Sequence, residues 1–369
     1  MSTGTMIDWW ETALGPAETE AAADAIRKRY IARGPLTHEL ENGLAEFLGT
    51  QHAVLTTSGS VALLLALMAR NIGPGDEVLV PNRTFMATAN APLLLGATVR
   101  LVDVEERCPV MSPASAEAAV TKNTKAILAV HRNGRAADIG ALQSLAAPRG
   151  IAVIEDAAQA MGSKRGNACL GTETGLGAFS LGITKLITIG QGGLVATNDD
   201  ALAERLRRLR NHGSLDARPT RYDEFGFNFR PADVLAGVGL KQLDSVADRM
   251  ERLRAVYRFY QDALADIPYV RLIPVQMDEG ELPLWAEVLC RKRGEVIPRL
   301  REQGIYAKPF LPSLSDAAYL KNETPFPNSR PFAEEGMVLP CGPDHPVAIL
   351  EQTVEALRNI GAQLGLMDS

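Results

Sequence analysis

Cysteine is scarce in this chain, with only four among 369 residues. The four stand far apart, at Cys108, Cys169, Cys290 and Cys341, and no two form a Cys-x-x-Cys pair. Disulfide frameworks and cysteine zinc sites both use characteristic cysteine spacings, so the sequence argues against both. We therefore expect reduced thiols and a cytoplasmic location.

Long apolar runs are also lacking. The most apolar stretch, Val61 to Met68, is far shorter than the roughly 20 residues that a membrane-spanning helix needs. The first fifteen residues contain acidic side chains and paired tryptophans, where a secretory signal would carry a basic and then an apolar region. The sequence predicts neither a membrane partner nor export.

No charge of one sign dominates the sequence. Lys and Arg number 38 and Asp and Glu 44, which gives a formal net charge of −6. Binding to nucleic acid depends on clustered basic residues, so we expect no nucleic acid partner. The content of 46% hydrophobic and 22% charged residues is typical of a globular protein and argues against extensive disorder.

Seven short β-rich segments alternate with helical patterns between about residues 50 and 200. This order predicts an α/β fold with a mostly parallel, seven-stranded sheet between helices on both faces. Several segments are apolar throughout, as strands buried on both faces are, and several end in a polar residue. The expected strands are His52–Thr56, Glu77–Val80, Thr98–Val102, Ala126–His131, Ala152–Glu155, Gly177–Leu181 and Gly193–Thr197.

The length and a change of pattern along the chain predict two domains. Residues 1–245 are expected to form an N-terminal segment and a large domain, and residues 246–369 a smaller α+β domain. Helical patterns cover Asp200–Arg210 and, as one long stretch, Pro231–Tyr260. Beyond about residue 265, proline separates short strands and helices, among them Gly294–Gln303 and Ala348–Leu364.

The segment Thr57-Ser58-Gly59-Ser60 lies between an expected strand and the helix expected at Val61–Arg70. Free backbone N–H groups and the helix dipole at a helix N-terminus favour an anion, so this turn can hold a phosphate group. Ser-Gly-Ser is also an ordinary helix cap, and the segment alone leaves both interpretations open.

A run of apolar residues leads directly into Glu155 and Asp156, with Gln159 shortly after. A carboxylate at the end of a buried strand can cap the next helix, pair with a protonated ring nitrogen of a cofactor, or bind a metal. No histidine or further carboxylate follows at metal-ligand spacing, so we predict no metal site.

Lys185 stands among apolar residues, next to Leu186 and Ile187. Removal of an ammonium group from water lowers its pKa and makes the amine a better nucleophile toward a carbonyl. Most lysines are solvated surface residues, but few charged partners are available in the sequence around this one.

The turn that can hold a phosphate, the acid Asp156 and Lys185 follow one another along the chain in the order that pyridoxal phosphate (PLP) enzymes use. From about Pro35 to the C-terminus the chain resembles the DegT/StrS family of sugar aminotransferases, which have PLP fold type I. The motifs that carry the resemblance are Thr57–Leu63, Gly73–Val78, Thr84–Asn90, Glu155–Gln159, Phe179-Ser180, Thr184-Lys185, Gly192-Gly193, Arg210–Gly213 and Gly226–Arg230.

The resemblance implies that Lys185 forms the Schiff base with PLP and moves the proton between substrate and cofactor. It implies that Asp156 pairs with the pyridine nitrogen and keeps it protonated. Gln159 would bond the phenolic oxygen of the cofactor, and Phe85 would stack on its ring.

By the same resemblance, Gly59, Ser60 and Ser180 hold the phosphate. Asn228 matches an asparagine that reaches the phosphate from the neighbouring subunit. The resemblance therefore also implies a homodimer with shared active sites. His131 matches a position near the site, where a role at the site and a purely structural role stay equally open. His212 lies in a turn with an expected structural role.

The chain departs from the family pattern at Leu181-Gly182-Ile183, after the lysine, and at Asn133-Gly134 and Pro231. These changes concern the substrate side more than the cofactor side. The relatives that dehydrate sugars replace the lysine by histidine, whereas this chain keeps Lys185. Transamination is therefore favoured over dehydration.

The expected function is transfer of an amino group from glutamate or glutamine to a keto sugar, nucleotide-linked in the leading interpretation. A free cyclitol or another ketone stays open as acceptor. Two further alternatives are another PLP reaction, such as dehydration or elimination, and a PLP-binding regulator without turnover, because a fold alone does not fix function.

Overall fold

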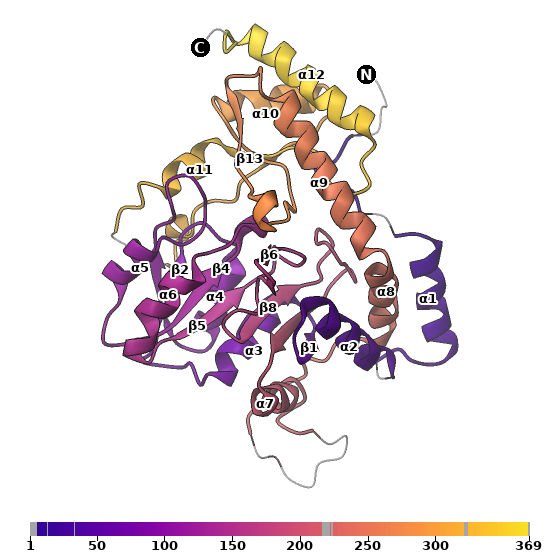
Figure 1. Cartoon of the computed structure of the whole chain (residues 1–369), viewed down its shortest axis with the longest axis vertical. Coiled ribbons are helices and arrows are strands. Elements are labelled where there is room, and N and C mark those ends of the chain that lie inside the picture. Colours follow the sequence, from indigo (N-terminus) through magenta and orange to yellow (C-terminus); the bar gives the residue numbers. More distant parts are fainter. Residues whose placement is uncertain are drawn as a thin grey trace.

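The computed structural model describes residues 6–12, 14–32, 34–215, 222, 224–320 and 324–367. Its larger part is a seven-stranded sheet between helices, and helices α9 to α12 lie with a smaller sheet at the other end (Figure 1). Within the described residues, no helix is both long enough and apolar enough to cross a membrane.

The large sheet has the strand order β1-β9-β8-β5-β4-β2-β3. All neighbouring pairs are parallel except those of β9, which runs antiparallel to β1 and β8. This confirms the predicted seven-stranded, mostly parallel sheet. The strands are β1 (His52–Thr56), β2 (Glu77–Pro81), β3 (Thr98–Val102), β4 (Thr124–Val130), β5 (Ala152–Asp156), β8 (Leu176–Ser180) and β9 (Gly193–Thr197).

Apolar side chains of these strands alternate between two cores, one on each face of the sheet. In β2, for example, Val78 and Val80 belong to one buried cluster and Leu79 to another. The first face packs against α3 (Gly59–Ala69), α4 (Met86–Leu94) and α7 (Asp200–Arg210). The other is covered by α2 (Leu36–Leu48), α5 (Pro113–Ala119), α6 (Ile139–Ala146) and α8 (Asp233–Asp244), and α1 (Pro16–Arg27) packs on α8.

The C-terminal part contains a four-stranded antiparallel sheet in the order β10-β11-β13-β12. Its strands are β10 (Val270–Leu272), β11 (Glu287–Cys290), β12 (Lys308–Pro309) and β13 (Gly336–Val338). Its helices are α9 (Val246–Ala263), α10 (Arg293–Glu302), α11 (Ser329–Glu335) and α12 (Val347–Gln363). A hairpin of β6 (Lys164–Arg165) and β7 (Ala168–Cys169) lies outside both sheets.

The stretch expected as one helix, Pro231–Tyr260, is two helices in the structure. Helix α8 ends at Asp244 and α9 begins at Val246, with Ser245 at φ −103° and ψ 6° between them. The apolar periodicity continues through Ser245, which is why the sequence pattern does not show the break. We propose this break as the boundary between the two predicted domains, 1–245 and 246–369.

The described N-terminal residues contact both parts of the molecule. Ile7 forms a bridge with Ile305, and Trp10 forms one with Cys341, both in the C-terminal part. The hydroxyl of Thr12 donates a hydrogen bond to the carbonyl of Ile183, 2.7 Å away, in the loop that carries Lys185. This segment therefore ties the C-terminal part to that loop.

Candidate active site

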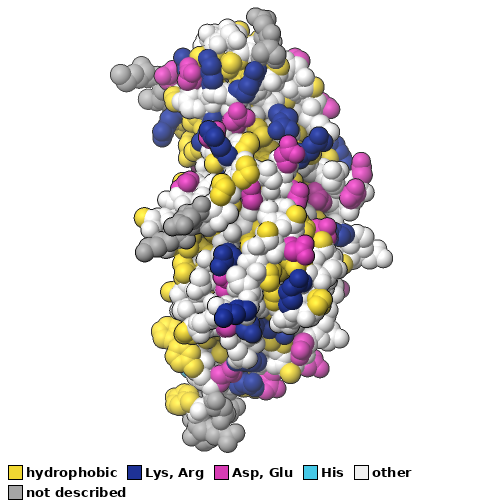
Figure 2. Space-filling view, turned by 90° about the vertical axis from the view of Figure 1, so that its left-hand side faces the viewer, with side chains coloured by type: hydrophobic (Ala, Val, Ile, Leu, Met, Phe, Trp, Pro, Cys, Tyr) yellow, Lys and Arg dark blue, Asp and Glu magenta, His cyan; other side chains and the backbone are white. Residues whose placement is uncertain are grey.

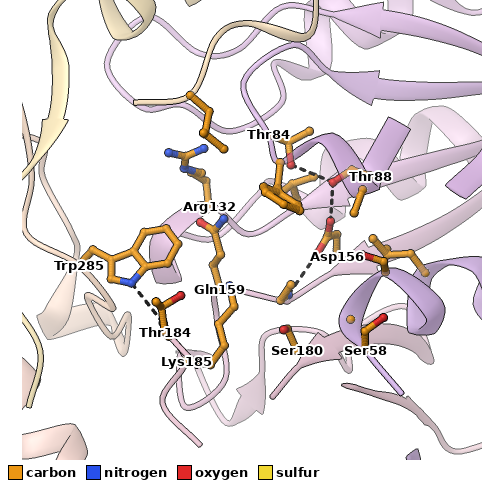
Figure 3. A pocket seen from close by; sticks show the side chains of 18 of the residues that line it. Ser58, Thr84, Thr88, Arg132, Asp156, Gln159, Ser180, Thr184, Lys185 and Trp285 are labelled. Carbon is orange, nitrogen blue, oxygen red and sulfur yellow. Dashed lines mark hydrogen bonds between the residues drawn. The ribbon is translucent and has the colours of Figure 1, made fainter. Parts of the chain in front are cut away.

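A cavity of about 300 Å³ lies beyond the carboxyl ends of the parallel strands, which is the usual place for a ligand in such sheets. Strands β2, β4, β5 and β8 all end toward it, and residues of the C-terminal sheet close it. Figure 3 shows side chains that line it. The polar and aromatic residues that line it include Ser58, Ser60, Thr84, Phe85, Thr88, Arg132, Asp156, Gln159, Ser180, Thr184, Lys185, Gln191, Trp285, Lys308 and Phe310.

The turn before α3 presents backbone donors to this cavity. The hydroxyl of Ser58 accepts a hydrogen bond from Val61 N, 3.3 Å away, and so caps the helix. Among the described residues, no group accepts a hydrogen bond from the N–H of Gly59 or Ser60. These two N–H groups, at the positive end of a helix dipole, form a site for an anion.

Gly193 explains how Ser180 comes to lie beside this turn. In strand β9 it pairs with Thr56 on one side and with Ser180 on the other. A Cβ atom at Gly193 would lie 2.5 Å from the carbonyl carbon of Ser58 and 2.6 Å from Gly59 N. Only glycine allows strand and turn to approach so closely, and this approach brings Ser180 to the anion site.

Asp156 is buried at the end of β5, with both carboxylate oxygens bonded. Oδ2 accepts a hydrogen bond from the hydroxyl of Thr88 at 2.8 Å, and Oδ1 accepts one from Ala158 N at 3.1 Å (Figure 3). Burial raises its pKa, while these hydrogen bonds and the nearby Lys185 oppose the rise. Among the described residues, no three His, Cys, Asp or Glu side chains gather to hold a metal ion.

Lys185 is inside the cavity without a carboxylate bonded to its ammonium group among the described residues. Its Nζ lies 5.1 Å from the ring centre of Trp285, whose Nε1 donates to the carbonyl of Thr184 at 3.3 Å. Burial lowers the pKa of Lys185, Asp156 opposes this effect, and the charges of Arg132 and Lys308 add to it, so that the pKa is about 8. The amine is therefore easily deprotonated, as a nucleophile toward an aldehyde must be.

Phe85 and Gln159 border the same cavity. Phe85 stands directly before α4 with 53% of its surface exposed, so its ring is free to stack on a flat ligand. The side-chain oxygen of Gln159 accepts a hydrogen bond from Asn133 N at 3.0 Å, which fixes the amide and leaves its NH₂ group as a donor.

His131 is buried and does not line the cavity. Its Nδ1 accepts a hydrogen bond from Ala137 N at 3.1 Å, so the ring proton belongs on Nε2, which lies 2.9 Å from Glu155. Its backbone N–H donates to the carbonyl of Asp156 at 3.0 Å. Of the two roles that the sequence left open, this geometry supports the structural one, next to Asp156.

Asn228 is not brought into the cavity of its own chain. It is exposed, lies in the loop that follows α7, and forms a bridge with Asn211, the residue directly after that helix. His212 in that loop has a positive φ of 57° and its ring lies 6.3 Å from that of Phe227. The other residues expected at the site, from Gly59 to Lys185, all line one cavity.

Several lining residues were not selected from the sequence. Thr88 lies within a motif that the sequence analysis singled out, and its spacing from Phe85 by one helical turn could have indicated it. Arg132, Trp285 and Lys308 gave no such signal. Trp285 and Lys308 reach the cavity from the C-terminal part, whereas Arg132 lies just after β4 and its Nη2 donates to Glu287 of β11 at 3.0 Å.

Comparison with known proteins agrees with this geometry. The model of the DegT/DnrJ/EryC1/StrS aminotransferase family matches residues 13–358. Among solved structures, S. venezuelae DesV in complex with a ketimine intermediate has 32% sequence identity and a TM-score of 0.88, covering 93% of this chain and 94% of that chain. A family aminotransferase from Brucella abortus has 29% identity and a TM-score of 0.88, with coverages of 93% and 95%. The aminotransferase TlmJ from Streptoalloteichus hindustanus has 26% identity and a TM-score of 0.93, with coverages of 98% and 100%.

Proposed function

Because this chain belongs to the DegT/DnrJ/EryC1/StrS aminotransferase family and is a PLP-dependent aminotransferase, we propose that it aminates a keto sugar. The proposed amino donor is glutamate or glutamine, and the proposed acceptor is a nucleotide-linked keto sugar. The observation that carries the proposal is Lys185, a half-buried lysine in the cavity with a lowered pKa, close to Asp156 and Trp285.

The cavity residues fit PLP. The free N–H groups of Gly59 and Ser60, together with the hydroxyl of Ser180, suit its phosphate. Asp156 suits the pyridine nitrogen, because a buried carboxylate without an Arg or Lys ion pair is available to a cationic ring. PLP, when bound, supplies an aldehyde that condenses with amines and a ring that withdraws electrons from the substrate carbon.

In the proposed roles, Phe85 stacks on the cofactor ring and the NH₂ group of Gln159 donates to its phenolic oxygen. With the cofactor bound, the Lys185 amine would accept the α-proton of the donor and would deliver it to the carbon that was the aldehyde carbon of the cofactor. A positioned amine contributes typically about 10²–10⁴-fold to the rate of such a proton transfer. A pKa of about 8 places Lys185 close to neutral pH, which suits both directions of transfer.

The side of the cavity next to Lys185 is polar, and the acceptor has to be compatible with it. Thr184 and Gln191 border the cavity beside Lys185, and their hydroxyl and amide groups suit the hydroxyls of a sugar. Retention of Lys185 supports transamination over dehydration. The alternatives are another PLP reaction on a sugar or cyclitol, and a regulator that binds PLP without turnover.

We expect the Lys185→Ala variant to have no turnover. In wild type, borohydride should attach PLP covalently to Lys185, and this labelled lysine should be missing in the variant. The measurement combines release of the keto acid from glutamate or glutamine with peptide mapping after borohydride reduction. Product analysis with and without a donor separates transamination from elimination. Unchanged turnover in the variant would refute the assignment, and PLP binding without any reaction across keto sugars and donors would support the regulator.

The proposed assembly is a homodimer in which Asn228 reaches the phosphate of the neighbouring subunit. Exposed apolar side chains support an interface near this loop, namely Leu215, Tyr222, Phe225 and Phe227. Apolar side chains also gather beside the grey residues at the lower end of the molecule (Figure 2). Exposed aromatic clusters of this kind mark contact surfaces more often than free surface.

A further inference from the structure

A second lysine borders the cavity close to Lys185. Lys308 of β12 lines it, and its Nζ lies 4.0 Å from the ring centre of Trp9 and 5.9 Å from that of Trp285. Lys185 and Lys308 thus both lie within 5.9 Å of the centre of one indole ring. In the described part of the chain, no carboxylate forms an ion pair with Lys308.

The aromatic surroundings hold this ammonium without neutralising it. Trp9 and Trp285 pack edge to face, with ring centres 5.8 Å apart, and both are largely buried. A cation beside an aromatic ring is stabilised by the ring quadrupole while its charge stays available to an anion. Burial and the charge of Arg132 lower the pKa of Lys308, which means that they disfavour its charged form. An anion that binds beside Lys308 therefore stabilises the ammonium group.

Arg132 supplies a second cation on the same wall. Its Nε and Nη2 bond Oε1 of Glu287 at 3.3 and 3.0 Å, and Arg135 Nη1 bonds Oε2 of Glu287 at 2.5 Å. The single carboxylate of Glu287 thus pairs with the guanidinium groups of both Arg132 and Arg135, so this buried cluster carries a net positive charge. The cluster cannot also neutralise Lys308, although the register of β11, β13 and β12 sets Glu287, Val338 and Lys308 in one row.

We infer that Lys308 and Arg132 form a subsite for the α-carboxylate of the amino-acid donor. The inference rests on the proposed function and adds the residues that select the donor. Arg132 and Trp285 lie on the side of the cavity away from Ser58 and Asp156, so this subsite is distinct from the phosphate turn (Figure 3).

The position of the subsite favours a carboxylate over the phosphates of a nucleotide-linked sugar. The α-carboxylate is attached to the same carbon as the reacting amino group, so it must lie next to the lysine that moves the α-proton. Lys308 meets this condition because its Nζ and that of Lys185 lie 5.9 and 5.1 Å from the centre of the same Trp285 ring. The phosphates of a sugar nucleotide are separated from the keto carbon by part of the sugar ring.

The test uses the PLP-loaded protein and the donor half-reaction alone. Wild type, Lys308→Met and Lys308→Gln are mixed with increasing glutamate or glutamine, and the loss of PLP absorbance gives the half-saturating concentration and the limiting rate. Lys122→Met is the matched control, because this exposed lysine lies in the turn before β4, at the opposite edge of the sheet.

We expect both Lys308 variants to raise the half-saturating donor concentration by about 10- to 100-fold, the usual effect of losing a charge-assisted hydrogen bond. The limiting rate should change far less, and Lys122→Met should behave as wild type. Binding of uridine diphosphate, measured by calorimetry, should be the same in all four proteins.

Three results would overturn the inference: donor saturation in Lys308→Gln equal to wild type, a loss confined to the limiting rate, or weakened binding of uridine diphosphate with unchanged donor saturation. Lys308→Gln keeps a polar but uncharged side chain, so it remains informative where Lys308→Met fails to fold. Failure of the proposed function is distinguishable, because wild type itself would then react with neither glutamate nor glutamine.

Discussion

At the scale of single residues, Lys185 shows how burial changes the chemistry of a side chain. A solvated lysine has a pKa of about 10.4, so at neutral pH almost all such side chains are protonated and very few are free amines. A pKa of about 8 increases the free-amine fraction at pH 7 roughly 200-fold. The cost is a buried charge, which the nearby Asp156 offsets.

The first prediction concerns the capture of PLP by the protein freed of cofactor. Because the free amine of Lys185 is the nucleophile, the capture rate should rise with pH and level off above about pH 8. Stopped-flow absorbance at a series of pH values measures the rate, with Lys185→Ala as the blank. A rate that keeps rising up to about pH 10 would show a solvated amine instead.

At the scale of elements, the site depends on strand β9, the one antiparallel strand of the large sheet. It joins β1 to β8, and Gly193 lets the turn at Ser58 pack against it. This contact involves backbone on both sides, so no rotamer change can relieve an added side chain.

We therefore predict that Gly193→Ala loosens the anion site. The added Cβ must push the Ser58–Gly59 backbone away, which should lower stability by about 1–3 kcal/mol and weaken PLP binding. Thermal unfolding and PLP titration measure the two effects. Gly294→Ala in α10 is the control, because a Cβ there meets nothing within 4 Å. Equal PLP affinity in Gly193→Ala and wild type would contradict the prediction.

The strands of the large sheet were predictable because they are apolar throughout and alternate with helices. Three of the seven have their observed bounds, and the other four differ by one or two residues at one or both ends. Lys185, Asp156 and the Gly59 turn were predictable because each lies within a local motif at a strand or helix end. The break at Ser245 was not, since helical periodicity continues through it.

Lys308 and Trp285 could not be selected from local patterns. Strand β12 has two residues, too few for any periodicity, and Trp285 lies in an irregular segment before β11. Both reach the cavity only because the C-terminal sheet packs over the large one, more than 90 residues along the chain from Lys185. Contacts of such sequence separation leave no signature in composition or spacing.

At the scale of the whole molecule, the proposed shared sites make a prediction about mixed dimers. Lys185→Ala and Asn228→Ala should each be strongly impaired alone. In a hybrid dimer with one subunit of each kind, one site carries both changes and the other carries neither, so activity should return. Purification of the hybrid through two different tags, followed by an activity assay, measures this. An inactive hybrid would mean that Asn228 serves the site of its own chain.

The three tryptophans of the chain, Trp9, Trp10 and Trp285, form one cluster beside the cavity, with neighbouring ring centres 6.2 and 5.8 Å apart. Almost all of the intrinsic fluorescence therefore originates next to Lys308 and Lys185. Emission from this cluster can report occupancy of the donor subsite without an attached dye, and it gives little information about events at the far end of the molecule.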